Sequence, residues 1–318
     1  MKPIIFILFL FTGISVAQNS YQEAQSLFIN NQFEAAEPIF KEHLSINPKD
    51  LKTIEYLGDI AGHKKEWDEA IGYYKTLVDA QDDNANYHYK YGGVLGMKAL
   101  EVNKFKALTM IGDIKNSFLK AAELDPNHID VRWALVEFYI QLPGIIGGSE
   151  KTAIYYANEL EDLSKVDGYL AKGYIAEYSD RPKDAEIYYK KAIEVGGSVT
   201  CYQKLSNLYE NTTEEPEKAI TIIEESQEKH QRNGLHYQIG KVCAQYNIQL
   251  EKGIGCLNVY IKNHSSTDGV PKSWAYYRLA QIYKHKGDKT NSLKYIEMAL
   301  AEKQLKLFVT EKELILNL

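Results

Sequence analysis

The sequence has few cysteines, and they form no ligand pattern. Three occur among its 318 residues: Cys201, Cys243 and Cys256. A zinc site usually requires paired Cys-x-x-Cys or Cys/His clusters, and these spacings supply neither. We therefore expect no metal site built on cysteine.

Positive charge is also in short supply. The chain carries 37 Lys and Arg against 43 Asp and Glu, which gives a formal net charge of -6. Nucleic-acid binding depends on clustered Lys and Arg that neutralise phosphates, and an anionic membrane surface attracts basic amphipathic stretches. The sequence shows neither feature, so we expect no nucleic-acid partner.

Long hydrophobic runs are missing after the first residues. The run Ile4–Phe11 is unbroken but too short to span a bilayer, which takes about 20 residues. Lys2 precedes it, and Ser15-Val16-Ala17 offers the small residues that a signal peptidase recognises. We predict that residues 1–17 are a secretory signal peptide. The mature chain is then exported, periplasmic or secreted, and does not insert into a membrane.

Catalytic motifs are lacking as well. The sequence contains no Gly-x-Ser-x-Gly elbow and no His-Glu-x-x-His. The segment Gly144–Thr152 superficially resembles a phosphate-binding loop, but Glu150 precedes Lys151 where glycine is needed for backbone N–H groups to wrap a phosphate. We expect no catalytic residues, no cofactor and no metal, and we interpret the chain as a non-enzyme. Catalytic residues that converge from distant segments stay an alternative.

What the sequence does have is a period of 34 residues. At this spacing Ala36 is followed by Ala70, and Phe40 by Tyr74. A fixed period in this range indicates a stack of small repeated units. Within each unit, apolar residues recur at offsets of three and four, which indicates two amphipathic helices. Small residues such as Gly58 and Ala70 would let these two helices approach closely.

The last unit shows the pattern most fully, with Leu279-Ala280, Tyr283, Gly287, Ser292, Ile296 and Ala299 in a fixed order. This order resembles the tetratricopeptide repeat, and Asp125-Pro126-Asn127 resembles the proline turn between repeats of that family. The resemblance implies an all-α fold, a right-handed α-solenoid of about eight tandem helix-turn-helix repeats over residues 18–304. Residues 305–318 are expected to form a C-terminal capping helix over the exposed apolar end.

The repeats are expected near residues 18–50, 51–84, 85–128, 129–166, 167–198, 199–232, 233–270 and 271–304. The third has about ten extra residues between Leu95 and Phe118, which we interpret as lengthened amphipathic helices. The fourth has a long Gly/Pro turn in which Ser149 can cap the following helix. The sixth and seventh are one residue out of register, so their boundaries stay open.

Tyrosine is unusually frequent, with 24 copies. Many occupy the aromatic packing position of a second helix, as Tyr74 does. The resemblance implies that first helices line a concave groove, and counting from the repeat starts places further rings and polar residues there. The predicted partner-binding residues are Tyr89, Trp133, Glu137, Tyr174, Tyr178, Asn207, Tyr237, Lys241, Trp274, Tyr277 and Gln281. The alternative is that some of these rings pack between neighbouring repeats.

These features favour an exported scaffold or adaptor that binds a protein or peptide partner in its groove. A glycan or cell-wall binder that uses the same aromatic groove is the alternative. Cys243 and Cys256 would lie on the two antiparallel helices of the seventh repeat, so a disulfide between them is sterically conceivable in an exported protein. The other interpretation is that the three thiols are small buried side chains.

Overall fold

The computed structural model of the chain describes residues 20–318, and every regular element in that range is helical. The expected all-α fold is thereby confirmed. The predicted signal peptide, residues 1–17, lies outside the described residues. Among the helices of residues 20–318, none has both the length and the apolar character that crossing a bilayer requires.

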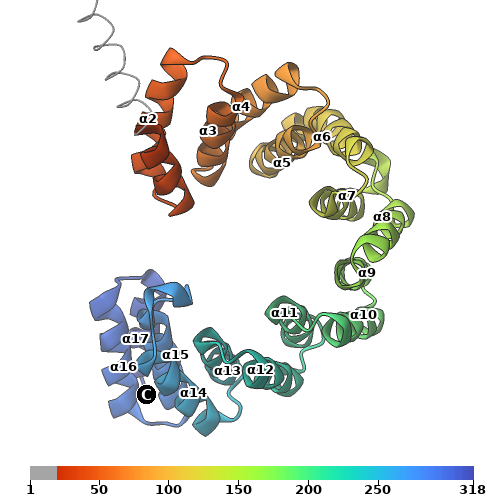
Figure 1. Ribbon diagram of the computed structural model, residues 1–318. Helices are drawn as coiled ribbons and strands as arrows, with labels where there is room; N and C mark the ends of the chain where they lie inside the picture. Colours follow the sequence, from red (N-terminus) through yellow and green to blue (C-terminus); the bar gives the residue numbers. More distant parts are fainter. Residues whose placement is uncertain (1–19) are drawn as a thin grey trace, which may run out of the picture. The chain divides into compact units, whose positions relative to one another are not determined.

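The helices pair into eight consecutive hairpins within the described residues, as the period predicts (Figure 1). The first hairpin joins residues 20–29 to α2. The elements are α2 (Phe33–Ile46), α3 (Leu51–His63), α4 (Trp67–Ala80), α5 (Ala85–Glu101), α6 (Lys104–Leu124), α7 (Ile129–Gln141), η1 (Gly144–Ile146), α8 (Glu150–Leu163), α9 (Lys165–Tyr178), α10 (Pro182–Val195), α11 (Val199–Asn207), η2 (Leu208–Thr212), α12 (Pro216–His230), α13 (Asn233–Tyr246), α14 (Leu250–Lys262), η3 (Ser266–Asp268), α15 (Lys272–His285), α16 (Lys289–Glu302) and α17 (Lys306–Leu316).

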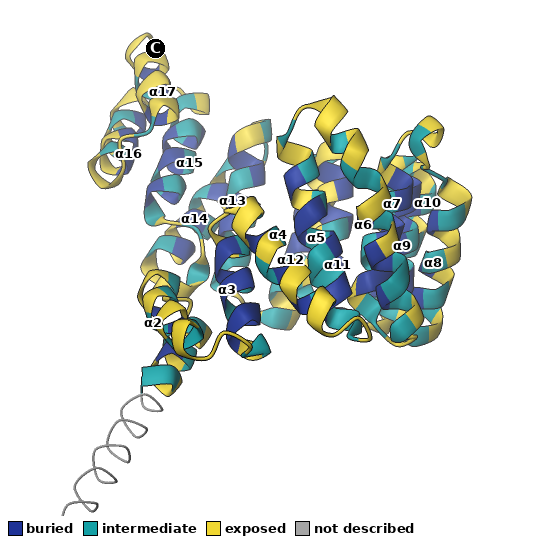
Figure 2. Cartoon of the chain, turned by 90° about the horizontal axis from the view of Figure 1, so that it is seen from above, coloured by how far each residue is buried: buried dark blue, intermediate teal, exposed yellow. Residues whose placement is uncertain are grey.

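The chain divides into two compact units, Met1–Tyr156 and Ala157–Leu318, and the division falls within α8. We call them the N-terminal and C-terminal units. In each unit, successive helices pack against one another, so each unit is a solenoid segment of stacked hairpins. Figure 2 shows that buried residues follow the sides of the helices that face their neighbours, while exposed residues cover the outer sides.

Small residues set the distance between the two helices of a hairpin. A Cβ atom added to Gly58 would lie 2.9 Å from the Tyr74 ring, and one added to Gly173 would overlap the Tyr189 ring. Each glycine therefore leaves the space that a buried tyrosine of the second helix fills. The expected close approach at this level of the hairpin is confirmed.

Polar caps begin several of the helices. The side chains of Asp50, Asn84 and Ser198 accept hydrogen bonds from backbone N–H groups in the first turns of α3, α5 and α11. Such caps satisfy donors that would otherwise lack partners at a helix N-terminus. The Ser149 hydroxyl accepts from the Thr152 N–H at the start of α8, as predicted.

The sequence predicts two irregular repeats in the N-terminal unit, the third with an insertion and the fourth with a long turn, and both are well-formed hairpins. The insertion of the third repeat lengthens α5 to 17 residues and α6 to 21, against 13 and 14 in α3 and α4. In the fourth repeat the turn closes on itself, because Gly147 adopts a φ of 106° and a Cβ at Gly148 would overlap the Leu142 carbonyl. Glycine is needed at both positions.

The extra residue of the sixth and seventh repeats is accommodated in two ways. In the sixth, the end of the first helix widens into the π-turn η2, Leu208–Thr212. In the seventh, the segment between α13 and α14 contains two residues in the left-handed region, Asn247 with a φ of 56° and Gln249 with a φ of 44°. The register shift seen in the sequence therefore corresponds to local backbone changes, and both hairpins are preserved.

The chain ends with α17, which packs on α15 and α16. Phe308 and Ile315 are fully buried in the cluster formed with Tyr277 and Ile296, while Leu314 is 52% exposed. The apolar side of this helix therefore covers the end of the last hairpin, where the sequence analysis expects a capping helix. The thiols of the chain are free: Cys201 and Cys243 are buried and Cys256 is half-buried. The disulfide left open by the sequence is not formed in this structure.

Candidate binding surfaces

The predicted binding residues all lie on first helices of the hairpins, and the structure gathers some of them while packing others into the core. Those in the N-terminal unit lie on α5 and α7, and those in the C-terminal unit on α9, α11, α13 and α15. Two surfaces with different chemistry contain five of the eleven residues.

The first surface is a polar pocket of about 400 Å³ between α9 and the end of α11. Its lining consists of Tyr174, Glu177, Tyr178, Lys204, Asn207 and Asn211, which we call the α9–α11 pocket. Three of these residues, Tyr174, Tyr178 and Asn207, are predicted binding residues. The sequence analysis did not find the other three.

Two tyrosine rings form one side of this pocket. Tyr174 and Tyr178 stand one helical turn apart on α9, with ring centroids 6.2 Å apart and planes inclined by 53°. Tyr178 is 53% exposed. The Lys204 ammonium lies 5.8 Å from the centroid of the Tyr174 ring, within cation–π range. The rings therefore offer apolar contact area beside a positive charge.

Hydrogen bonds hold the base of the same pocket. The Glu177 carboxylate accepts from the Tyr189 hydroxyl at 2.8 Å and from the Thr212 hydroxyl at 2.9 Å. Burial and the neighbouring Glu177 raise the pKa of Tyr189 far above its usual value, so its hydroxyl stays protonated and able to donate. Because Thr212 belongs to η2, this bond ties the π-turn to α9.

The π-turn also determines which side chains reach the pocket. Asn207 is the last residue of α11, and Asn211 lies four residues later within η2. Both are exposed. A carboxamide carries donors and an acceptor together, so two of them can bond to both kinds of main-chain group in an extended peptide. Asn211 could have been found from the one-residue register shift of the sixth repeat. The prediction of groove residues counted positions from the repeat starts and did not include that shift.

The second surface is an apolar trough of about 660 Å³ in the N-terminal unit. We call it the α5–α7 trough: α5 contributes the face from Tyr89 to Leu100, α6 the face from Lys104 to Phe118, and α7 the residues from Ala134 to Gln141. Leu142, which follows α7, and Ile146 of η1 complete it. The predicted residues Tyr89 and Glu137 belong to it. The amphipathic face of the inserted segment was noted in the sequence, but its closure over α7 was not predicted.

Several predicted rings are buried instead. Tyr237 is 7% exposed and packs against Tyr260. Tyr277 is 4% exposed and stacks on Phe308, which also meets the Trp274 ring edge-on at 5.2 Å. Tyr237 and Tyr277 are buried and Trp274 is half-buried, and each packs against a ring of a neighbouring helix, whereas the alternative stated from the sequence was packing between neighbouring repeats. A binding role for them stays a prediction.

The remaining predicted residues make contacts within the protein. Gln281 donates from Nε2 to the Tyr277 hydroxyl at 2.9 Å, and the Lys241 ammonium pairs with the buried Glu210 carboxylate at 2.9 Å. Trp133 is half-buried on α7. None of these three lines either of the two surfaces described above.

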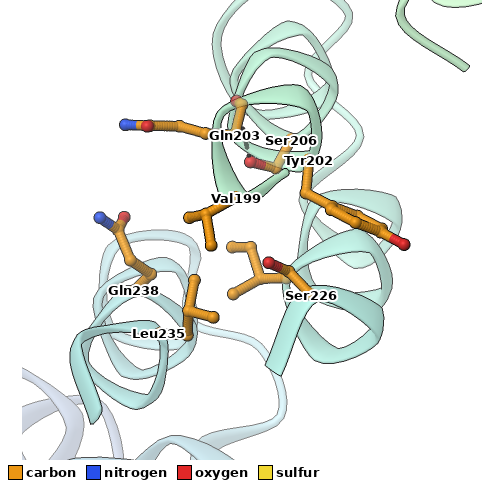
Figure 3. A pocket seen from close by; sticks show the side chains of 8 residues that line it. Val199, Tyr202, Gln203, Ser206, Ser226, Leu235 and Gln238 are labelled. Atoms are coloured by element: carbon orange, nitrogen blue, oxygen red, sulfur yellow. Dashed lines mark hydrogen bonds between the residues drawn. The ribbon is translucent and has the colours of Figure 1, made fainter. Parts of the chain in front are cut away.

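A small cavity of about 70 Å³ lies between α11, α12 and α13 (Figure 3). Val199 and Leu235 point into it, and Ser226 approaches it from α12. The Ser226 hydroxyl is buried and has no hydrogen-bond partner among the described residues. A space of this size suits a few water molecules rather than a ligand.

Carboxylates also gather between α2 and α4. Oxygens of Glu37, Glu66 and Glu69 lie within 4.8 Å of one another. Lys41 and Lys64 both pair with Glu37, at 2.6 and 2.9 Å. The lysines offset this negative charge, and we assign no ion to the group.

Comparisons with known proteins agree with this architecture. The family model described as tetratricopeptide repeat matches residues 166–195 and 275–303, which contain α10 and α16 with most of α9 and α15. No curated protein sequence matches the chain.

Solved structures provide the comparison of folds. A tetratricopeptide repeat protein from Parabacteroides merdae is 12% identical, with a TM-score of 0.52 over 94% of this chain and 98% of that one. YrrB, described as a tetratricopeptide repeat protein with an unusual peptide-binding site, is 15% identical, with a TM-score of 0.43 over 62% and 97%. A thermophilic protein of this type from Thermus thermophilus is 12% identical, with a TM-score of 0.40 over 77% and 99%. The fold comparison rests on the first of these, which has the same helical repeat architecture. Two segments of the chain are thus similar to the tetratricopeptide repeat in sequence, and the described residues share its helical repeat fold.

Proposed function

We propose that this protein is an exported scaffold or adaptor that binds a peptide segment of a partner protein, and that the α9–α11 pocket is its recognition site. The protein acts by binding and carries out no reaction. Proteins built from these repeats generally mediate protein–protein interactions, which supports the general class.

One observation carries the proposal. Tyr174, Tyr178 and Asn207, selected from the repeat register alone, line a single pocket together with Lys204 and Asn211. Rings supply contact area at low entropy cost, the carboxamides can bond to a peptide main chain, and the ammonium favours an acidic side chain or a carboxylate. We therefore expect the bound segment to be extended and to place an acidic group at Lys204, away from the Glu177 carboxylate that also lines the pocket.

The test begins with selection of binders from a library of random peptides about 12 residues long. Affinities of the selected peptides are then measured by calorimetry. Tyr178→Ala and Asn207→Ala should each weaken binding about tenfold or more without lowering the melting temperature, because both side chains are exposed. Ile187→Ala is the matched control, since Ile187 on α10 is also 53% exposed but lies outside the pocket. Selected peptides that bind both variants as tightly as the original protein would contradict the proposal.

A glycan ligand is the second candidate, because exposed tyrosine rings also stack on sugar faces. The 53° angle between Tyr174 and Tyr178 favours a peptide, since two rings that share one sugar face need to be nearly coplanar. Titration with soluble cell-wall fragments distinguishes the two. Saturable binding that Tyr178→Ala abolishes would favour the glycan.

Export is the remaining part of the proposal, and the sequence of residues 1–17 supports it. Fractionation of expressing cells, followed by N-terminal sequencing, tests it. We expect the mature protein outside the cytoplasm with Gln18 as its first residue. A full-length chain that remains in the cytoplasm would refute export and leave the binding site unaffected.

A further inference from the structure

Consecutive residues of the π-turn η2 face different ways. Asn211 is exposed and lines the α9–α11 pocket, whereas Glu210, the residue before it, is only 3% exposed. The turn closes through the Thr213 N–H, which donates to the Leu208 carbonyl five residues back at 3.0 Å. π-Helices are rare and occur mostly as single turns, frequently at functional sites. The contacts that fix the path of η2 therefore also fix where the Asn211 carboxamide lies.

Two side chains of η2 are bonded to the preceding repeat. The Tyr209 hydroxyl donates to the Glu186 carboxylate of α10 at 2.8 Å, and the Thr212 hydroxyl donates to Glu177 of α9 at 2.9 Å. Asn211 differs from them, because its side chain makes no hydrogen bond within the part of the chain that the structure describes. Its carboxamide is therefore available to a ligand, while the residues around it are held.

The following repeat holds Glu210. The Lys241 ammonium of α13 lies 2.9 Å from its Oε1 atom, and the Tyr246 hydroxyl donates to its carbonyl at 2.8 Å. No hydrogen-bond donor of the described residues is well aligned on this buried oxygen, so the ion pair with Lys241 is what offsets its charge. A buried carboxylate that loses its partner is strongly destabilising. Lys241 therefore stabilises η2 at the residue next to Asn211.

We propose that Lys241 is a positioning residue for the α9–α11 pocket. It is not part of the lining, but it holds Glu210 in the interior while Thr212 is bonded to Glu177, and the residue between them then lies in the pocket. The polar side of the pocket is thus set by three successive repeats. This role rests on the proposed function of the pocket, since the position of Asn211 matters only where something binds.

Hydrogen exchange followed by mass spectrometry tests the positioning without any ligand. Lys241→Met keeps most of the side-chain stem but removes the ammonium, so Glu210 is left buried and unpaired. We expect amides of residues 208–213 to exchange at least about tenfold faster than in the original protein, and those of α9 to change less than about twofold. Exchange in residues 208–213 that stays as slow as in the original protein would overturn the proposal, whether or not any peptide binds.

Lys284→Met is the matched control, because it breaks the same kind of ion pair elsewhere. Lys284 of α15 pairs with the Glu311 carboxylate of α17 at 2.5 Å, and neither residue lines the pocket. Glu311 is 5% exposed, close to the value for Glu210. Both variants should lower the melting temperature, because each leaves a buried carboxylate without its partner. Only Lys241→Met should speed exchange in η2.

Affinities for the peptides selected on the pocket form the second measurement. Lys241→Met should weaken binding about tenfold, whereas Lys284→Met should leave it unchanged. Lys241→Arg keeps the positive charge and should retain the affinity to within about threefold. In an Asn211→Ala background, Lys241→Met should weaken binding by less than about twofold, because the residue through which it acts is already gone. Equal losses in both backgrounds would overturn the positioning role.

A second variant keeps the test decisive if Lys241→Met does not fold. Lys241→Met combined with Glu210→Gln leaves no unpaired charge, so it should melt close to the original protein. Residues 208–213 should still exchange faster and the selected peptides should still bind more weakly, because the ion pair to α13 is absent. Original exchange and original affinity in this variant would refute the role of Lys241. If the pocket captures no peptide at all, the proposed function fails, and exchange alone still decides whether Lys241 holds η2.

Discussion

Replacing Phe308 by alanine tests how the last hairpin is stabilised. Phe308 on α17 is fully buried, stacked on Tyr277 with ring centroids 5.0 Å apart and edge-on to Trp274 at 5.2 Å. Loss of a buried phenylalanine costs about 3–5 kcal/mol, which includes the cavity that remains. A terminal helix can partly collapse into such a cavity, so we expect a loss of about 3 kcal/mol.

The loss should be local, because each repeat in a solenoid contacts only its neighbours. Trp274 touches Phe308, so its fluorescence reports unfolding of this end once Trp67 and Trp133 are replaced by phenylalanine. In urea, with a slope of about 1–3 kcal/mol per molar, Phe308→Ala should lower the midpoint of the Trp274 transition by roughly 1–3 M. Circular dichroism of the whole chain should change less.

Leu314→Ala is the matched control, since Leu314 lies on the same helix but is 52% exposed. Its effect should stay within about 0.5 kcal/mol. The reasoning is refuted if both variants shift the Trp274 transition equally. It is also refuted if Phe308→Ala shifts it by less than about 0.3 M.

Three further changes have expected results in urea unfolding. Gly173→Ala should lower stability by about 1–3 kcal/mol, because the added Cβ would press on the buried Tyr189 ring. Gly93→Ala should raise stability by about 0.5–1 kcal/mol, because a Cβ there meets nothing within 4 Å. Similar changes in both variants would contradict this account of the packing. Burial raises the pKa of Cys243 to about 11 from about 9, so the neutral thiol contributes fully to the free energy of unfolding below pH 9, and about 2–3 kcal/mol of that contribution is lost as pH rises through 11. The difference in stability between the original protein and Cys243→Ala should therefore shrink over this range. A difference that stays constant would refute the raised pKa. Ser226→Ala should change stability by less than about 1 kcal/mol, since the hydroxyl has no partner in the described residues, and a loss above about 2 kcal/mol would reveal a hydrogen bond.

The architecture was predictable because the signals that encode it are local. The 12-residue interval from Gly58 to Ala70 fixes where two helices touch, and the same interval separates Gly173 from Ala185. Each pair places a ring of the second helix against the glycine of the first. Such a rule needs no knowledge of distant contacts, so even the lengthened helices of the third repeat could be predicted.

The binding surfaces were predictable only in part, because burial of a ring depends on residues far along the chain. Tyr174 lines a pocket, whereas Tyr277, one helical turn earlier within its own repeat, is buried. Part of the cover on Tyr277 is Phe308, which lies 31 residues later and outside the repeats. No periodicity within a single repeat contains that information.

The two candidate surfaces both arise where the repeat is broken. The insertion of the third repeat extends α5 and α6 and forms the walls of the trough, while the extra residue of the sixth becomes the π-turn that contributes Asn211 to the polar pocket. In the regular second repeat, the inward acids Glu55 and Asp59 are instead bonded to Lys90, at 2.7 and 2.8 Å. In regular repeats the polar groups pair with those of the neighbouring repeat, because the same contact recurs at every step, and few polar groups are left to bind a ligand. Specificity in such a protein should therefore be sought first in its departures from the period.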